Sequence, residues 1–524
     1  MNKISILDTT LRDGMQGVEV NFSLSDKIQI AHELDELGID IIEAGFPLSN
    51  DKEAAFFRNI RKEKFRHAAI AAFGSTRRPG AVAHNDEHLK ALLEAETPWV
   101  VIVGKTWKAH VEKVIRTTAQ ENLDMIASSV SCLKAEGRGV VFDLEHFFDG
   151  YRDDPAYALQ VLKTATREGA DFLCLCDTNG GILPMEVISV LDALSREELA
   201  PLGVHFHNDT GNGVANSILA LAHGARHVQG TINGWGERCG NANLCSILPT
   251  IALKLKYECS ANAHVSKITS LSRFVFEKAN IIPDKRQPYV GEAAFSHKAG
   301  QHADVLAKAD YLMEHIDSRL VGNERRILLS ELAGKSTIVD KLSRYGEFDK
   351  NSPEVEKLIA TLKEKENLGY EYEAAEASFD ILIRKVLGAF TPLAELSNYH
   401  LESYKTGGVP AKTVGRMFLR VQGKEVMGAA VGIGPFETLD GSLRSALEPF
   451  FPFLKNISLT DYKVRVLNAE TEGSASKVRV FISCTDHHQH TWDTVGVSEN
   501  IEEASWEALV DSLNYYFNTF IVKQ

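Results

Sequence analysis

The sequence of 524 residues has no long apolar stretch, and no segment approaches the roughly 18 consecutive apolar residues of a membrane-spanning helix. Residues 1–11 also lack the apolar core of a signal peptide, because polar side chains occur from the start. Positive charge is in deficit, since 57 Lys and Arg face 71 Asp and Glu and give a net charge of −14. We therefore expect neither a membrane nor a nucleic-acid partner, because both require a basic face.

The seven cysteines form no pairing pattern. Their number is odd, they are scattered, and no two are spaced as CxxC. We interpret them as the reduced thiols of a cytoplasmic protein. Apolar residues make up 44% of the chain, enough for a sizeable core, and the length indicates about three domains.

The first 260 residues repeat one pattern: an apolar run, a polar or glycine-containing turn, and a helical segment. The apolar runs are Ile4–Leu7, Ile39–Ile42, Ala68–Phe73, Trp99–Val103, Gly139–Phe142, Phe172–Cys176, Val204–Phe206 and Val228–Ile232. Short, continuously apolar runs are typical of parallel strands buried on both faces. The helical segments include Ser25–Leu37, Pro155–Glu168, Pro184–Leu194 and Asn212–His223. Eight units in about 250 residues predict a (β/α)8 TIM barrel. An open doubly wound sheet is the alternative that periodicity leaves open.

The pattern changes twice after residue 260. Charged helical segments such as Pro353–Glu366 predict a helical linker region. From about residue 396, starting near Asn398–Tyr404 and ending with a helix at Ile501–Phe517, the order βββα is expected twice. We therefore predict three parts: a barrel over residues 1–260, helical linker subdomains over 261–395, and a small α+β domain over 396–524.

The polar residues that could carry chemistry cluster at one end of the predicted strands. They are Arg12 and Asp13 after the first strand, Glu43 after the second, Glu145 after the fifth, Thr178 after the sixth, His205 and His207 on and after the seventh, and Asn241 after the eighth. In a TIM barrel these loops converge on the C-terminal face, where active sites of this fold lie. This placement predicts a single active site at the barrel mouth.

His205 and His207 are the clearest local indication of a metal site. Residues i and i+2 of a strand point to the same side, so two imidazoles can chelate one ion. The simpler interpretation is a core histidine followed by a loop histidine. Asp13 and Asn241, brought to the same rim, favour a divalent ion kept partly open to substrate. The ligand set does not distinguish Mg, Mn, Zn and Co.

Three further residues could take part in the chemistry at the mouth. Arg12 could form a salt bridge across the barrel mouth, or could stabilise an anion that develops on a carbonyl oxygen beside the metal. Glu145 could be a structural carboxylate, a general base, or a group that orients one. Thr178 could donate a hydrogen bond to a substrate carboxylate, although one threonine alone is weak support.

Several motifs resemble the isopropylmalate, homocitrate and citramalate synthases over essentially the whole chain. These are Thr10–Gln16, His205–Asp209 and Gly240–Ala242 in the barrel. Gly432–Pro435, Asp461–Val464 and Glu503–Leu509 are similar to the allosteric amino-acid-binding domain of that family. The longer strings Phe73–Arg78, Gly104–Trp107, Glu145–Tyr151 and Leu175–Gly181 are most similar to its citramalate synthase branch.

The resemblance implies a role for each site residue. It implies Asp13, His205, His207 and Asn241 as metal ligands, Arg12, Glu145 and His302 as catalytic residues, and Arg12, Gln16 and Thr178 as substrate contacts. His302 belongs to the segment His297–Lys308, which matches the linker motif that brings a catalytic histidine over the barrel mouth. In that motif Gln301 stands where the family usually has an aliphatic residue.

The activity that the resemblance implies is a Claisen-type condensation of acetyl-CoA with a short 2-oxo acid. With pyruvate and water the products are (R)-citramalate and CoA, a step of isoleucine biosynthesis. Glu145 and His302 are both candidates for the base that removes a methyl proton from acetyl-CoA. The resemblance also implies an amino-acid feedback inhibitor bound to a regulatory C-terminal domain, and a homodimer that exchanges the linker.

Three other functions compete with this hypothesis. A barrel lyase or aldolase such as hydroxymethylglutaryl-CoA lyase shares the barrel motifs but lacks the C-terminal βββα pair. A non-catalytic amino-acid sensor predicts a degenerate barrel site, whereas the residues of the predicted site are all present. A 2-isopropylmalate synthase, which acts on 2-oxoisovalerate in leucine biosynthesis, is the main competitor within the family.

Overall fold

The computed structural model describes residues 3–297, 313–327, 335–467, 476–488 and 490–522. The chain divides into two units, one formed by residues 1–295 with 314–325 and the other by residues 296–313 with 326–524. Among the described residues, no helix is both long and apolar enough to cross a membrane. The expected boundaries at residues 260 and 395 remain predictions.

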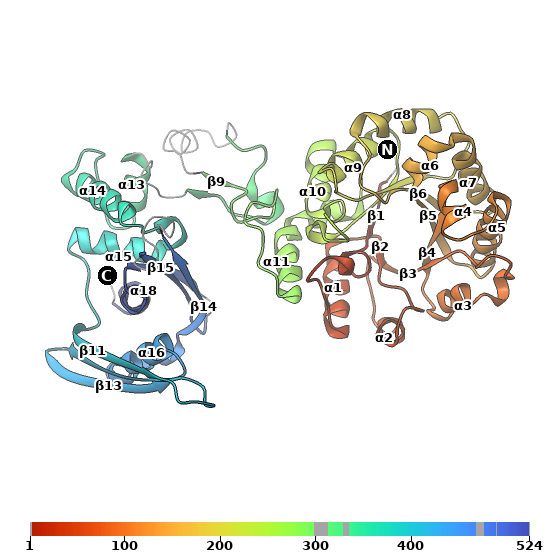
Figure 1. Ribbon diagram of the computed structural model, residues 1–524. Coiled ribbons are helices and arrows are strands. Elements are labelled where there is room, and N and C mark those ends of the chain that lie inside the picture. Colours follow the sequence, from red (N-terminus) through yellow and green to blue (C-terminus); the bar gives the residue numbers. More distant parts are fainter. Residues whose placement is uncertain (1–2, 298–312, 328–334, 468–475, 489, 523–524) are drawn as a thin grey trace. The chain divides into compact units, whose positions relative to one another are not determined.

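The first unit contains a closed barrel of eight parallel strands, each paired with the next and β1 paired with β8. The strands are β1 (Ser5–Asp8), β2 (Ile41–Glu43), β3 (Ala69–Ser75), β4 (Trp99–Lys105), β5 (Gly139–Glu145), β6 (Phe172–Asp177), β7 (Leu202–Phe206) and β8 (His227–Gly230). Figure 1 shows strands β1 to β6 arranged around the ring. The predicted TIM barrel is confirmed, and the open doubly wound sheet is wrong.

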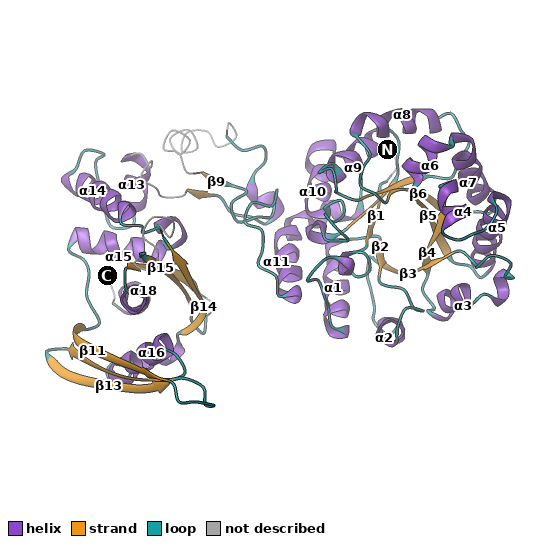
Figure 2. Cartoon of the chain, viewed as in Figure 1, coloured by secondary structure: helices purple, strands orange, loops and turns teal. Residues whose placement is uncertain are grey.

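Helices surround the ring of strands, as Figure 2 shows. They are α1 (Leu24–Leu37), α2 (Asp51–Ile60), α3 (Glu87–Glu94), α4 (Lys108–Lys113), α5 (Ala119–Ala135), α6 (Phe147–Asp153), α7 (Pro155–Arg167), α8 (Pro184–Leu194), α9 (Gly213–Ala222), α10 (Leu244–Pro249) and α11 (Ile268–Ala279). Local sequence sets their ends. Ser23 and Asp26 form a capping box at the start of α1, and Gly38 ends that helix in the left-handed region at φ 89°.

The barrel interior is filled by alternate residues of the strands. The buried cluster there contains Leu7, Ile41, Ala71, Val101, Val141, Cys174 and Cys176. Because side chains along a strand alternate between its two faces, the residues two positions further along the same strands also point inward. Several strands continue further than the sequence indicated: Glu43 ends β2, Asp143 and Glu145 lie on β5, and Asp177 ends β6, whereas loop positions were expected.

The second unit repeats one small motif. The antiparallel strands β11 (Glu395–Tyr404), β12 (Lys412–Val421) and β13 (Lys424–Gly432) precede α16 (Pro435–Leu447). The strands β14 (Ser458–Val466), β15 (Val478–Thr485) and β16 (Thr491–Ser498) precede α18 (Ile501–Tyr516). The predicted pair of βββα motifs is confirmed.

The unit also contains β9 (Ser296–His297), β10 (Arg326–Ile327) and the helices α13 (Lys335–Leu342), α14 (Pro353–Asn367) and α15 (Glu376–Leu387).

Asp35 fixes the connection between α2 and β3. Its buried carboxylate accepts hydrogen bonds from the backbone N–H groups of Arg66 at 2.9 Å, His67 at 2.7 Å and Ala68 at 2.7 Å. Burial raises the pKa of Asp35, but these three N–H donors more than offset it, so the net pKa lies below its usual value. Because the folded-state pKa is depressed, this contribution to stability is present above about pH 4 and is lost as pH falls.

We therefore expect Asp35→Ala to lower the thermal midpoint of the barrel, because three partly buried backbone N–H groups lose a charged acceptor at a cost of roughly 1–3 kcal/mol. The difference from the unchanged protein should narrow as pH falls from about 5 toward about 2, through the unfolded-state and folded-state pKa values of the carboxyl group. Calorimetry at both pH values measures it, with Asp124→Ala on the exposed side of α5 as the control. An equal difference at both pH values would contradict this account.

Candidate active site

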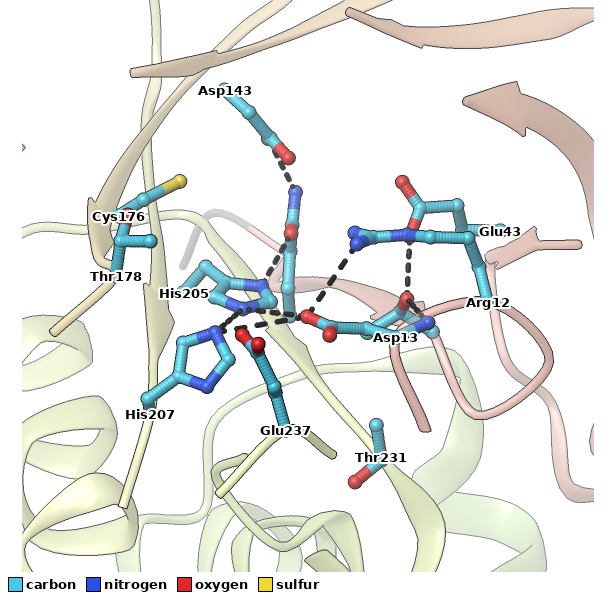
Figure 3. Close-up of polar contacts among 12 residues, drawn as sticks. Arg12, Asp13, Glu43, Asp143, Cys176, Thr178, His205, His207, Thr231 and Glu237 are labelled. Atoms are coloured by element: carbon cyan, nitrogen blue, oxygen red, sulfur yellow. Dashed lines mark hydrogen bonds and ion pairs between the residues drawn. The ribbon is translucent and has the colours of Figure 1, made fainter. Parts of the chain in front are cut away.

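The mouth of the barrel collects polar side chains from most strands. At the C-terminal ends lie Arg12 and Asp13 after β1, Glu43 on β2, Lys105 on β4, Glu145 on β5, Thr178 after β6, His205 and His207 on and after β7, and Asn241 after β8. Figure 3 shows several of these groups pointing toward one another. The sequence-based prediction of convergence is therefore confirmed for the described residues.

Asp13, His205 and His207 form a buried group of possible metal ligands. Their ligand atoms all lie within 4.8 Å of one another. The Oδ2 atom of Asp13 lies 3.2 Å from Nε2 of His205 and 3.8 Å from Nε2 of His207, and the two Nε2 atoms are 3.4 Å apart. Two imidazole nitrogens and a carboxylate oxygen that share one small space suit a divalent cation.

Asn241 is the fourth expected ligand, and its buried side chain lacks hydrogen-bond partners among the described residues. Neither its amide oxygen nor its amide nitrogen has a hydrogen-bond partner within the described parts of the chain. Backbone pairing places Asn241 opposite His207. Gly240 allows this approach at φ 87°, because a Cβ there would lie 2.0 Å from the carbonyl oxygen of Gly234. A buried amide without a partner fits coordination through its oxygen.

A chain of hydrogen bonds orients His205. The Gln229 Nε2 atom donates to Asp143 at 2.9 Å, which leaves the Gln229 Oε1 atom to accept from Nδ1 of His205, also at 2.9 Å. With its proton on Nδ1, His205 turns the lone pair of Nε2 toward Asp13. Groups behind a ligand act in this way, fixing the tautomer and the orientation of the ring.

The protonation states of Asp13 and His207 also fit a cation. Burial raises the pKa of Asp13, but Arg12 and both imidazoles more than offset this, so the net pKa lies well below its usual value. Burial, and in second place any positive charge on the neighbouring ring of His205, lowers the pKa of His207 to about 4. Asp13 is therefore ionised and His207 neutral at pH 7, and these are the forms in which each side chain binds metals.

Asp143, Cys174 and Cys176 form a second compact group inside the barrel. Burial raises the pKa of Cys176 to about 11 and that of Cys174 well above its usual value. Burial and the charge of Glu43 raise the pKa of Asp143 to about 7. Metals bind the thiolate form, so this group fits a metal poorly and packs as part of the interior, as expected of two cysteines on one strand.

Arg12 is held in place from two sides. Its Nε donates to a carboxylate oxygen of Glu43 at 2.7 Å, and its guanidinium lies 4.0 Å from the centre of the Phe73 ring. Asp13 lies 3.6 Å from another guanidinium nitrogen. A planar cation fixed in this way keeps its remaining N–H groups directed into the mouth beside the candidate metal ligands.

Glu145 and Thr178 lie at the same mouth. The carboxylate of Glu145 forms an ion pair with the ammonium group of Lys105 on the neighbouring strand. The hydroxyl oxygen of Thr178 accepts a hydrogen bond from the backbone N–H of His146 at 2.9 Å, so its own proton is available to a ligand. Gln16 ends the short helix Gly14–Gln16 and is exposed at the rim.

One predicted site residue, His302, is still to be placed. His302 lies outside the described residues, so its position stays a prediction.

Three residues of the mouth had no assigned role at the sequence level: Glu43, Lys105 and Gln229. Each occupies an inward position of its strand, so the alternation of side chains was the signal that could have identified them.

The geometry defines a barrel of a known class, and comparison with known proteins agrees. Residues 3–275 match the family model described as HMGL-like, residues 289–369 the model of the homocitrate synthase post-HMGL domain, and residues 373–517 the LeuA allosteric (dimerisation) domain. The first match spans more than half of the chain. The protein is therefore an HMGL-like barrel protein with a LeuA-type C-terminal region.

Full-length relatives identify the branch. The chain is 48% identical to the (R)-citramalate synthase of Aquifex aeolicus, over 98% of this chain and 97% of that protein. It is 46% identical to the (R)-citramalate synthase of Geobacter sulfurreducens, over 98% of both chains. A probable 2-isopropylmalate synthase of Methanosarcina mazei is 30% identical, over 98% of this chain and 95% of that protein. The chain belongs to the (R)-citramalate synthase family.

We expect His205→Ala to lose bound divalent metal and activity while the fold survives, because one nitrogen ligand and the link to Gln229 are removed together. Elemental analysis after dialysis measures the metal, and circular dichroism checks the fold. His223→Ala, at the exposed end of α9, is the matched control and should keep its metal. A folded His205→Ala protein that is active and fully loaded with metal would refute the ligand assignment.

Proposed function

We propose that this protein condenses acetyl-CoA with pyruvate and water to give (R)-citramalate and CoA. The observation that carries the proposal is full-length membership of the (R)-citramalate synthase family, at 42–48% identity to five of its members. The relatives described as probable 2-isopropylmalate synthases are more distant, at 29–30% identity. The enzyme is thus a condensing acyltransferase, which converts the acyl group to an alkyl group on transfer.

The site residues have complementary tasks in this reaction. A divalent ion held by Asp13, His205, His207 and Asn241 would polarise the carbonyl group of the 2-oxo acid. Arg12, fixed by Glu43 and Phe73, stabilises the negative charge that develops on that carbonyl oxygen. Thr178 donates a hydrogen bond to the carboxylate of the 2-oxo acid, and Gln16 approaches the same substrate from the rim.

The acyl-CoA half of the reaction requires a base. Glu145 and His302 are the two candidates for removing a proton from the acetyl methyl group. The resulting carbon nucleophile attacks the carbonyl carbon of the 2-oxo acid. Water then cleaves the thioester, which releases CoA and makes the overall step irreversible.

The alternatives have less support. A lyase of the hydroxymethylglutaryl-CoA type would not explain the match of residues 373–517 to the LeuA allosteric domain. A non-catalytic sensor would not explain a buried ligand group at the barrel mouth. 2-Isopropylmalate synthase keeps the same barrel and site, so the choice between pyruvate and 2-oxoisovalerate depends on the pocket for the side chain of the substrate.

Regulation, assembly and location complete the proposal. The LeuA-type region supports feedback inhibition by an amino acid, with isoleucine the first to test for a citramalate synthase and leucine for an isopropylmalate synthase. The same domain is described as a dimerisation domain, which supports a homodimer. A cytoplasmic location is supported by the seven cysteines, all of which are unpaired.

The substrate is tested by CoA release from acetyl-CoA in the presence of a divalent ion. Pyruvate, 2-oxobutanoate, 2-oxoisovalerate and 2-oxoglutarate are compared at equal concentration. We expect the highest kcat/KM with pyruvate, because the family relation favours the smallest 2-oxo acid. A preference for 2-oxoisovalerate would move the enzyme to the isopropylmalate branch, and no turnover with any of the four acids would refute condensation.

A further inference from the structure

The mouth of the barrel contains one ion pair that the assigned ligands do not explain. Lys105 ends β4 and Glu145 ends β5, and the two residues are direct partners in the register of these strands. Their side chains form an ion pair, with 22% and 23% of the respective side chains exposed. The pair is therefore largely sheltered but reachable from the open end of the barrel.

Both side chains point into the barrel. Val101 on β4 and Val141 on β5 belong to the interior cluster, and Lys105 and Glu145 lie four residues further along the same strands. An even separation keeps a side chain on the same face of its strand. Asp143, between Val141 and Glu145, confirms the direction, because it accepts a hydrogen bond from Gln229 inside the barrel.

The ion pair lies across the mouth from the metal ligands. The ligands come from the loop after β1, from the end of β7 and from the loop after β8, and these three strands are neighbours in the ring. β4 and β5 are neighbours on the opposite side of the same ring. The mouth thus has two halves, one with a metal-ligand group and Arg12, the other with Lys105 and Glu145.

The two halves of the mouth match the two substrates of a condensation, the 2-oxo acid and the thioester. The metal ligands and Arg12 serve the carbonyl oxygen of the 2-oxo acid, whereas the methyl group of a thioester also has to be deprotonated. Deprotonation places negative charge on the thioester oxygen, and that charge requires its own donor. Lys105 is the cation beside the candidate base.

We propose that Lys105 is a catalytic residue that stabilises the enolate oxygen of acetyl-CoA, an assignment that rests on the proposed condensation. Glu145 takes a proton from the methyl group, the C–H electron pair forms the C=C bond, and the π electrons of the thioester C=O move to its oxygen. Protonation neutralises Glu145, so the ammonium group of Lys105 turns to the new enolate oxygen. The C=O bond of the thioester then re-forms as the methylene carbon bonds to the 2-oxo carbon, and the π electrons of the 2-oxo C=O bond move to its oxygen beside Arg12.

The ion pair explains why both residues are needed. Before the step, the ammonium group of Lys105 is paired with the carboxylate of Glu145. After the step, the same charge balances the enolate, so the net charge of this half of the mouth does not change. A single cation thus serves the carboxylate first and the substrate oxygen second.

The test uses the full-length, metal-loaded enzyme with pyruvate and either acetyl-CoA or acetyl-CoA deuterated at the methyl group. Lys105→Met should lower kcat by about 100-fold or more, the usual effect of removing one donor to an oxyanion. Metal content and the KM for pyruvate should stay unchanged, and the deuterium isotope effect on kcat should rise above that of the unchanged enzyme, because proton removal becomes slower. Lys108→Met, which removes a neighbouring lysine paired with Asp154, should have none of these effects.

A second variant distinguishes a catalytic role of Lys105 from an effect of the substitution on folding. Lys105→Ala should recover part of its activity when methylammonium or ethylammonium is added, since a small cation can occupy the space of the lost side chain. Rescue by the amine would support the assignment even if Lys105→Met folds poorly. No rescue together with loss of metal would assign Lys105 a structural role and overturn the proposal.

Other outcomes separate this inference from the proposed function. A near-normal kcat in Lys105→Met, or a raised KM for pyruvate with the isotope effect unchanged, would overturn the role of Lys105 while leaving condensation intact. The second result would place Lys105 on the 2-oxo acid. If the unchanged enzyme releases no CoA with any 2-oxo acid, the proposed function fails, and the assignment of Lys105 fails with it.

Discussion

The alternation of side chains along parallel strands, locked by closure of the barrel, is the constraint on which the site depends. Once Leu7, Val101, Val141 and Cys174 face inward, every second residue on their strands faces inward as well. At the last inward position, packing no longer demands an apolar residue, because the barrel opens there. Polar groups such as Lys105 and Glu145 therefore lie at the C-terminal end of the barrel, where they contact one another.

Buried charges at this mouth stabilise one another through a network. Asp13 stays ionised beside Arg12 and the two imidazoles, and Arg12 is fixed by Glu43. Gln229 links His205 to Asp143 and thereby sets the tautomer of the ligand. A cation among Asp13, His205 and His207 would complete the network, and Asn241 offers the amide oxygen that still lacks a partner.

The barrel and the proximity of Asp13, His205 and His207 could be predicted from the sequence because both leave local patterns. Short apolar runs separated by helices predicted the strands, and the spacing of His205 and His207 indicated chelation. Glu43, Lys105 and Gln229 had no such pattern. Glu43 and Lys105 follow apolar runs and could equally be loop residues, whereas Gln229 is a single polar residue near the start of a run. Only the inter-strand register, which brings Lys105 opposite Glu145 and Gln229 beside His205, shows what these side chains contact.

The central claim is that the mouth of the barrel holds one divalent ion between Asp13, His205, His207 and Asn241. Anomalous diffraction from crystals of the full-length protein grown with Mn²⁺ tests it most directly, because the method locates the ion without reference to activity. We predict one strong anomalous peak in contact with these four side chains. A peak at Asp143, Cys174 and Cys176 instead, or no peak inside the barrel, would contradict the account.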